Sequence, residues 1–468
     1  MASVVEDRAR SDALVDHSSL PAVLKYILLI IFCFAQFLDA FNNSSLFAAI
    51  PPISVDLHIV NSTSVWLISA YQLTFAALLL SSGRLSDLYD PKYVFVAGML
   101  LMSFCALGAG FVRVEVPLIV LRALMGVGAA LNIPSAMALI IRLFPNPAAH
   151  FVLAILSFVL LPSTSYSPSP SLVGQARQYS RLKRLDLIGV SLLTAALVLF
   201  IFAVTSGSID GWGSARVIAP LVLSVFLAVI FFLWELYLPE SLAAVPPSMW
   251  KYRNFTILIA VGLQPFMWWA AVQLLFSWYY QEVFEWSTIN TAVHFLPLGL
   301  VSFPTMGLAS VLQQKFSLKW VILCGEIIVL AGTVLFPFAD SKEHYWRFAF
   351  PGFCLGTAGM TMVFATTNIA LFAITPPEVA GIVGAVFTCA LQLGSAAGAA
   401  IVTSIQTSVQ ESHGGSNGFQ GRSAGFWFLF AFTAVETLGV LFFMRNTVPP
   451  VVQQMEKERQ IEAVGTVS

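Results

Sequence analysis

Residues 66 to 122 read WLISAYQLTFAALLLSSGRLSDLYDPKYVFVAGMLLMSFCALGAGFVRVEVPLIVLR. They contain two apolar runs, Trp66 to Ser81 and Tyr93 to Val112. A membrane-spanning helix needs about 20 predominantly apolar residues, and each run reaches that length with its flanks. The stretch therefore predicts two consecutive membrane helices.

The two runs are joined by a short hydrophilic turn, which holds Gly83, the opposite charges Arg84 and Asp87, and then Asp90-Pro91-Lys92. Arg122 follows within the next apolar run. A charged side chain facing lipid is costly, so we expect this arginine to face protein or water.

Composition places most of the chain in a lipid environment. Of 468 residues, 58% are hydrophobic and 10% are charged, against about 25% charged in typical soluble chains. The net charge of −1 argues against a nucleic-acid partner. All five cysteines lie inside apolar runs, which suggests neither disulfides nor a zinc site. The polar first twenty residues show no cleavable-signal pattern, so we expect the first span to be an uncleaved anchor.

Hydropathy predicts an all-α polytopic membrane protein with about twelve full transmembrane helices. We place them near residues 25–50, 63–82, 93–112, 117–141, 185–206, 216–238, 255–281, 289–312, 319–339, 346–373, 379–405 and 424–444. One further apolar segment, 150–161, is too short to cross unaided. If it does not cross and the N-terminus is cytoplasmic, 17 of the 23 lysines and arginines fall inside and five outside. The positive-inside bias therefore predicts a surface helix or a dip at 150–161.

The turn and the arginine together resemble the major facilitator superfamily of secondary transporters. Gly83-Arg84-Leu85-Ser86-Asp87 is similar to the loop motif between helices 2 and 3 of that family, and Arg122 to its helix-4 arginine. The resemblance extends over nearly the whole chain and implies alternating access between two helical bundles.

Later motifs resemble the fungal branch with fourteen helices, the drug:proton antiporters. The residues around Asp90-Pro91-Lys92 resemble those of an aminotriazole-resistance-like subgroup. Leu185-Asp186-Leu-Ile-Gly189 is similar to the opening of that branch's helix 7. Gly381-Ile-Val-Gly384, followed by Gly394 and Gly398, is similar to its helix 13. Measured against that pattern, helix 5 and most of helix 6 are missing between Pro147 and Pro162.

The resemblance gives the expected division of the chain. We expect a cytoplasmic N-terminal tail (1–24), helices 1 to 4 (25–149), a residual helix-6 segment and cytoplasmic linker (150–184), two extra central helices (185–238), a C-terminal six-helix bundle (239–445) and a cytoplasmic tail (446–468).

Asp39 is the first candidate for proton coupling. It lies fourteen residues after Lys25, about 21 Å along a helix, with Asn42 and Asn43 one turn later on the same face. Burial disfavours the charged carboxylate, which would let it load and release a proton near neutral pH. The family carries an acidic residue at the matching position. The alternative is a wet, structural carboxylate near the outer rim.

The resemblance gives Arg122 a role in proton relay, although it lies close enough to its helix end to snorkel. Gly83, Arg84, Asp87 and Lys92 form the predicted gating loop, in which Gly83 permits a tight turn and the charges form a network that breaks when the bundles rock. Asp90-Pro91-Lys92 departs from the family's glycine and basic residues. The alternative is an ordinary solvated turn.

Substrate contacts are expected from polar and aromatic side chains within spans: Asn42, Asn43, Gln264, Trp268, Gln273 and Glu326. Trp269 belongs to the same aromatic face, Pro265 marks a kink, and Glu436 is a second lone carboxylate. Glycines expected to permit close helix packing are Gly126, Gly128, Gly381, Gly384, Gly394 and Gly398.

The sequence thus predicts proton-coupled efflux of small organic compounds, without a cofactor, a metal or catalytic residues. We expect a monomer in the plasma membrane, with the vacuolar membrane as the alternative. Competing functions are transport of a specific solute, nutrient or ion, and a truncated protein that does not transport. The chain has no Gly-Lys pair, and hence no phosphate-binding loop for ATP-driven pumping.

Overall fold

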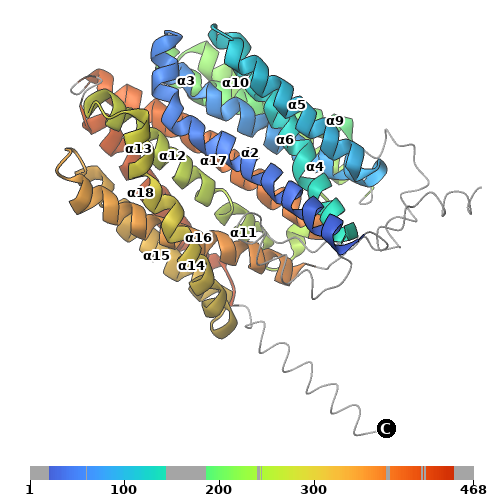
Figure 1. The fold of residues 1–468 in the computed structure, drawn as a ribbon. Coiled ribbons are helices and arrows are strands. Elements are labelled where there is room, and N and C mark those ends of the chain that lie inside the picture. The colour runs from blue at the N-terminus through green and yellow to red at the C-terminus, as the bar shows by residue number, and fades with distance from the viewer. Residues whose placement is uncertain are drawn as a thin grey trace, which may run out of the picture.

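The computed structural model describes residues 21–59, 61–143, 186–239, 243, 245–375, 380–412, 415 and 418–446. Within these ranges every regular element is a helix (Figure 1). Ten helices are long and apolar enough to cross a membrane, and the described part of two more holds the shorter apolar stretches Trp66–Leu79 and Ile188–Val204. The predicted all-α membrane fold is confirmed. The predicted segment 150–161 lies outside the described residues.

The first group of helices comprises α2 (Ala22–Asp56), α3 (Asn61–Ser64), α4 (Trp66–Leu88), α5 (Pro91–Phe111) and α6 (Glu115–Leu143). Helix α6 packs along both α4 and α5. Glycines permit this close approach: a Cβ atom at Gly126 would collide with the backbone oxygen of Tyr71 on α4, and one at Gly128 would lie 2.8 Å from the backbone oxygen of Gly98 on α5.

The C-terminal group contains α11 (Phe255–Val261), α12 (Gln264–Trp278), α13 (Thr288–His294), α14 (Leu296–Lys315), α15 (Leu318–Thr333), α16 (Phe350–Ile374), α17 (Ala380–Ser412) and α18 (Gln420–Phe443). Short irregular helices complete it: η3 (Pro247–Lys251), η4 (Tyr279–Val283), η5 (Phe336–Phe338) and η6 (Tyr345–Ala349). Its apolar core is centred on Trp268, Phe276, Phe336, Phe353 and Phe426.

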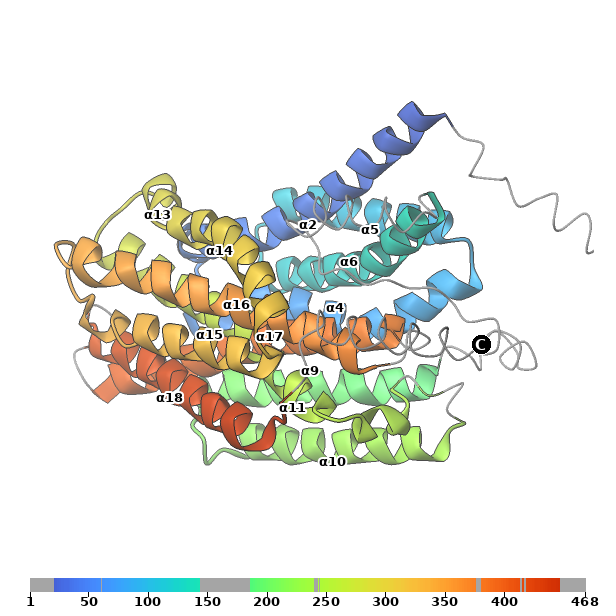
Figure 2. The same ribbon diagram turned by 90° about the horizontal axis from the view of Figure 1, so that it is seen from below.

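The two groups meet along α17, which packs on α4 as well as on α12 and α18 (Figures 1 and 2). The pair α9 (Leu187–Asp210) and α10 (Ala215–Tyr237) lies beside this junction, because α9 contacts both α4 and α17. Helix α2 contacts α12 and α13 across the junction. In Figure 2 the N-terminal end of α2 extends away from the other helices.

One predicted boundary is wrong. The polar stretch 83–92 is not one turn, since α4 continues through Gly83 to Leu88 and only Tyr89 and Asp90 separate it from α5. Arginine, leucine and aspartate continue a helix readily enough for α4 to end where Pro91 can begin the next one. The Asp90 side chain caps α5 by accepting a hydrogen bond from the backbone nitrogen of Lys92 at 3.1 Å.

The span predicted over 255–281 corresponds to one candidate membrane span, Phe255–Val283, which is interrupted close to the kink predicted at Pro265. Helix α11 ends at Val261, and α12 begins at Gln264 after a two-residue break at Gly262 and Leu263. Pro265 explains the position of the break, because proline has no backbone N–H and is accommodated in the first turn of a new helix.

Candidate functional site

Three helices bring Asp39, Tyr71 and Arg122 together, from α2, α4 and α6 respectively. The hydroxyl group of Tyr71 donates a hydrogen bond to Oδ1 of Asp39. The Arg122 guanidinium lies over the Tyr71 ring, with Cζ 4.7 Å from the ring centre. Tyr71 is 1% exposed and Arg122 4% exposed, so both are removed from lipid and solvent. Tyrosine thus stands between the predicted carboxylate and the predicted arginine.

Arg122 does not snorkel to the membrane surface. Its Nε atom donates to the backbone oxygen of Leu67 at 2.9 Å, and Nη1 donates to Oδ1 of Asn42 at 3.3 Å. Its third nitrogen, Nη2, is buried and has no hydrogen-bond partner among the described residues. A buried guanidinium with one unused donor is suited to receive a further acceptor, such as a carboxylate or a substrate oxygen.

Local sequence positions these side chains. Asn42 and Asn43 follow Asp39 at one-turn spacing on α2, and Asn42 reaches Arg122 whereas Oδ1 of Asn43 is buried without a partner in the described part of the chain. Gly126 follows Arg122 by one turn and contacts Tyr71 and Thr74 on α4. Thr74 in turn donates to the backbone oxygen of Ala123 at 2.7 Å. The glycine therefore sets the distance between α4 and α6 at the level of the site.

This arrangement is suited to proton exchange. The Asp39 carboxyl group accepts a hydrogen bond from Tyr71, whose ring lies against the guanidinium of Arg122, so movement of α4 or α6 changes its surroundings. Among the described residues, no group of three histidine, cysteine, aspartate or glutamate side chains is placed to bind a metal ion.

The structure describes the surroundings of two of the four predicted gating residues, Gly83 and Lys92. Gly83 lies in the last turns of α4, and a Cβ atom added there would have no neighbouring atom within 4 Å, so close packing does not require glycine at this position. Lys92 is exposed at the start of α5. The side chains of Arg84 and Asp87 lie outside the described part, and the predicted charge network therefore stays a prediction.

The predicted substrate residues of the C-terminal half do not join Asp39. Gln264, Trp268 and Glu326 are each at most 1% exposed. Trp268 donates to Oγ1 of Thr333 at 2.8 Å, and Gln264 donates to Oε2 of Glu326 at 2.9 Å. Gln273 is half-buried on α12. Gln264, Trp268 and Glu326 thus line the interior between α12 and α15, and only Asn42 and Asn43 of the predicted substrate residues lie beside Asp39 and Arg122.

The glycines of α17 lie at close contacts with α12. A Cβ atom at Gly394 would collide with the backbone oxygen of Leu263, and one at Gly398 would lie 2.5 Å from Cγ of Met267. Gly384 is buried on the same helix, and Gly381 lies in its first turn. Gly394 therefore packs against the break between α11 and α12.

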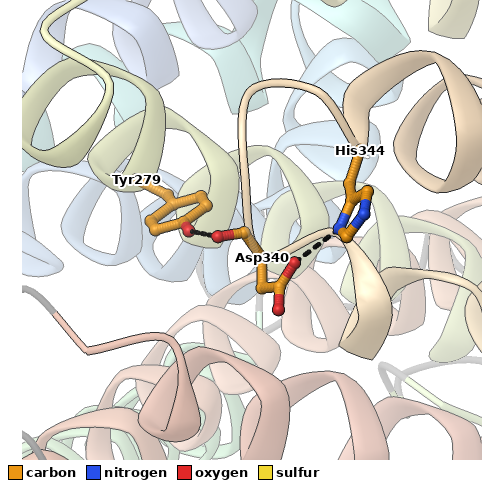
Figure 3. Close-up of polar contacts among 3 residues, drawn as sticks. All are labelled: Tyr279, Asp340 and His344. Atoms are coloured by element: carbon orange, nitrogen blue, oxygen red, sulfur yellow. Dashed lines mark hydrogen bonds and ion pairs between the residues drawn. The ribbon is translucent and has the colours of Figure 1, made fainter.

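Sequence reasoning missed a polar network that includes Tyr279, Asp340 and His344 (Figure 3). The Tyr279 hydroxyl donates to the backbone oxygen of Asp340, whose carboxylate lies 2.6 Å from Nδ1 of His344. Arg422 lies over the Tyr279 ring and pairs with Glu282 at 3.5 Å. Tyr279 and Glu282 sit at a span end, where polar residues are ordinary, and their pairing depends on helix positions that periodicity does not give.

Comparison with known proteins agrees with this fold. A family model described as Major Facilitator Superfamily matches residues 32–399. The puromycin resistance protein pur8 of Streptomyces alboniger is 28% identical over 413 residues, which cover 81% of this chain and 81% of the relative. The multidrug transporter mfsC of Aspergillus fumigatus is 25% identical over 351 residues, covering 66% and 64%. The low affinity ammonium transporter of Saccharomyces cerevisiae is 25% identical over 411 residues, covering 78% and 77%.

The family match spans well over half of the chain and includes Asp39, Tyr71 and Arg122. The helices, the buried arginine and this match lead to the same conclusion: the chain belongs to the Major Facilitator Superfamily and is a multi-pass membrane transporter.

Proposed function

We propose that this chain exports small organic compounds in exchange for protons, as a member of the fourteen-helix drug:proton antiporter branch. The observation that carries the proposal is the hydrogen bond from the buried Tyr71 to Asp39, beside the buried Arg122. If Asp39 gains or loses a proton when Arg122 releases or binds a substrate oxygen, proton transfer and substrate binding are coupled at one site. Relatives named for puromycin resistance and multidrug transport support organic compounds as the substrate class.

Alternating access has support in the packing between the two groups. Near the predicted outer ends, Gln281 donates to the backbone oxygen of Ala48 on α2 at 2.9 Å. An apolar cluster joins the groups there, including Phe47, Ile50, Leu274 and Trp278. In the predicted cytoplasmic half, an apolar cavity of about 340 Å³ lies between α4, α9, α11 and α17, lined among others by Ala76, Leu193, Ile259 and Val386. This supports an outward-closed state.

The test is accumulation of a drug in intact cells, with puromycin as the probe. Cells that express the chain should hold less puromycin than control cells, and a protonophore should remove the difference. We expect the protein at the plasma membrane, which a fluorescent fusion tests in the same cells. Lower accumulation that persists unchanged with the protonophore would contradict proton coupling.

A second candidate function is transport of a specific small solute. The similarity to a protein named as a low affinity ammonium transporter favours it. Uptake of labelled methylammonium by the expressing cells, with no change in puromycin accumulation, would support this function over drug export.

A third candidate is a shortened protein that inserts but does not transport. The alignment with pur8 has 413 positions, which is more than the 81% of 468 residues that this chain contributes, so the relative has positions without a counterpart here. This is consistent with the absence of two family helices. Sequencing the transcript across the codons for residues 146 to 162 tests it, because a longer message would return the missing helices.

A further inference from the structure

A second polar centre lies in the C-terminal group, away from the site on α2. It is formed by Glu326 on α15, Glu436 on α18 and Gln264 at the start of α12. Their exposed fractions are 0%, 9% and 1%, so each side chain is at least nine-tenths buried. Gln264 contacts Glu326 on α15 and Thr433 on α18, and Glu436 follows Thr433 by three residues, on the same side of α18. Neither the family match nor the proposed coupling through Asp39 assigns a function to this centre.

In this centre the hydrogen-bond donors all have partners, whereas several acceptors have none within the described ranges. Nε2 of Gln264 donates to Oε2 of Glu326 at 2.9 Å and to Oγ1 of Thr433 at 3.0 Å, and its donors are thereby used. Three buried oxygens have no partner among the described residues: Oε1 of Glu326, Oε2 of Glu436 and Oε1 of Gln264. All three are acceptors, so what the centre lacks is a donor or a cation.

No positive side chain supplies that charge in the described part. On α15, Lys319 donates to the backbone oxygen of Leu441 at 2.8 Å, close to the helix end. On α18, Arg422 pairs with Glu282 at the other end. Helices α11 and α16 contain no lysine, arginine, aspartate or glutamate, and on α17 the only charged residue is Glu411. The other titratable side chains on helices α15, α16 and α17 are the thiols of Cys324, Cys354 and Cys389.

Two carboxylates in a low-dielectric interior without a cation cannot both be ionised. A proton on one of them turns an unpartnered acceptor into an O–H donor, and that donor can satisfy a neighbouring acceptor. The three unpartnered oxygens are fewer than the roughly six to eight oxygen ligands that an ion such as Ca²⁺ takes. We propose that Glu326, Glu436 and Gln264 form a second proton-binding site, in which the two carboxyl groups hold one proton between them.

The position of Gln264 connects this site to motion between the groups. Gln264 is the first residue after the break at Gly262 and Leu263, and Gly394 of α17 packs against that break. Helix α17 also packs on α4. A shift of α17 therefore moves the amide that binds Glu326, which changes the affinity of the pair for its proton. The use of this proton in transport rests on the proposed function, whereas its binding does not.

Infrared spectroscopy of the purified full chain in lipid nanodiscs tests the proposal without any transported substrate. The C=O stretch of a protonated carboxyl group is separate from the bands of an ionised one. At neutral pH, the wild type minus the double variant Glu326→Gln and Glu436→Gln should show the band of one protonated carboxyl group. The exposed Glu343 provides the matched control, since Glu343→Gln should leave that band unchanged.

Thr433→Val keeps both carboxyl groups and removes one Gln264 contact, so it should shift the frequency of the band without removing it. This second variant decides the question if the double variant does not fold. An identical spectrum for wild type and double variant would overturn the proposal. A band that disappears when sodium replaces potassium would also overturn it, because sodium would then be the occupant. Asp39→Asn should leave this band in place, which separates failure here from failure of the proposed coupling.

Discussion

The contacts of Arg122 require an arginine side chain at this position. Its Nε and Nη1 atoms reach two different acceptors, Leu67 and Asn42, while its plane covers the Tyr71 ring. Lysine has one nitrogen and no plane, and cannot make all three contacts. We expect Arg122→Lys to reduce proton-driven transport about tenfold or more, equivalent to about 1.4 kcal/mol. Drug uptake into inverted vesicles measures this, and Arg113→Lys, at an exposed position, should transport normally.

The Tyr71 hydroxyl should set the pH at which the site works. It donates to the Asp39 carboxylate, and hydrogen bonds to the ionised form favour that form. Tyr71→Phe removes this donor but keeps the ring, so the protonated carboxyl group is favoured. The pH of half-maximal transport should therefore rise, by about one unit if the lost bond is worth about 1.4 kcal/mol. A pH profile of vesicle uptake measures the shift, and a profile unchanged from wild type would contradict this role.

At the residue scale, the sequence was sufficient to single out Asp39, Asn42 and Arg122 but not Tyr71. A charge in an apolar run is conspicuous because it is costly there. A tyrosine is ordinary in membrane helices, and only the rotation of α4 relative to α2 and α6 places Tyr71 between the charges. For the same reason Glu326 and Glu436 could be singled out individually, but the packing of their helices, α15 and α18, against each other could not be predicted.

At the element scale, small residues control helix distances. A side chain at Gly126 would collide with backbone and threonine atoms of α4, whereas Gly110 on α5 has nothing within 4 Å. We expect Gly126→Val to destabilise the protein by about 1–3 kcal/mol, as overpacking typically does. Gly110→Val should have much less effect. Thermal unfolding of purified protein, followed by fluorescence-detected size exclusion, measures both. Equal melting for the two variants would show that α4 and α6 tolerate greater separation.

Hydropathy located the helices well because the membrane requires about 20 apolar residues per span. It could not locate their ends, because polar residues of α4 continue the helix past Gly83. The interruption of the span over 255–281, in contrast, lies where Pro265 marked a kink. How closely α17 approaches that break at Gly394 depends on neighbouring helices, and the sequence of one span does not contain it.

At the scale of the whole molecule, the contact between α2 and η4 should open and close during transport. Gln281 and Ala48 are in hydrogen-bond contact across the two groups. Cysteines at both positions, in a background with the five native cysteines replaced by alanine, should be joined by a short bifunctional thiol reagent. The cross-link should abolish transport, and either single cysteine treated in the same way should retain it. Full activity of the cross-linked protein would show that these ends do not separate.

The central claim is that Asp39 couples the proton to the substrate. The most direct measurement compares two activities of the purified protein in liposomes: uptake of puromycin driven by a proton gradient, and exchange of labelled for unlabelled puromycin without a gradient. Asp39→Asn should lose gradient-driven uptake and keep exchange, because a neutral side chain can still allow the helices to alternate but cannot carry the proton. Gradient-driven uptake by Asp39→Asn at the wild-type rate would contradict the account.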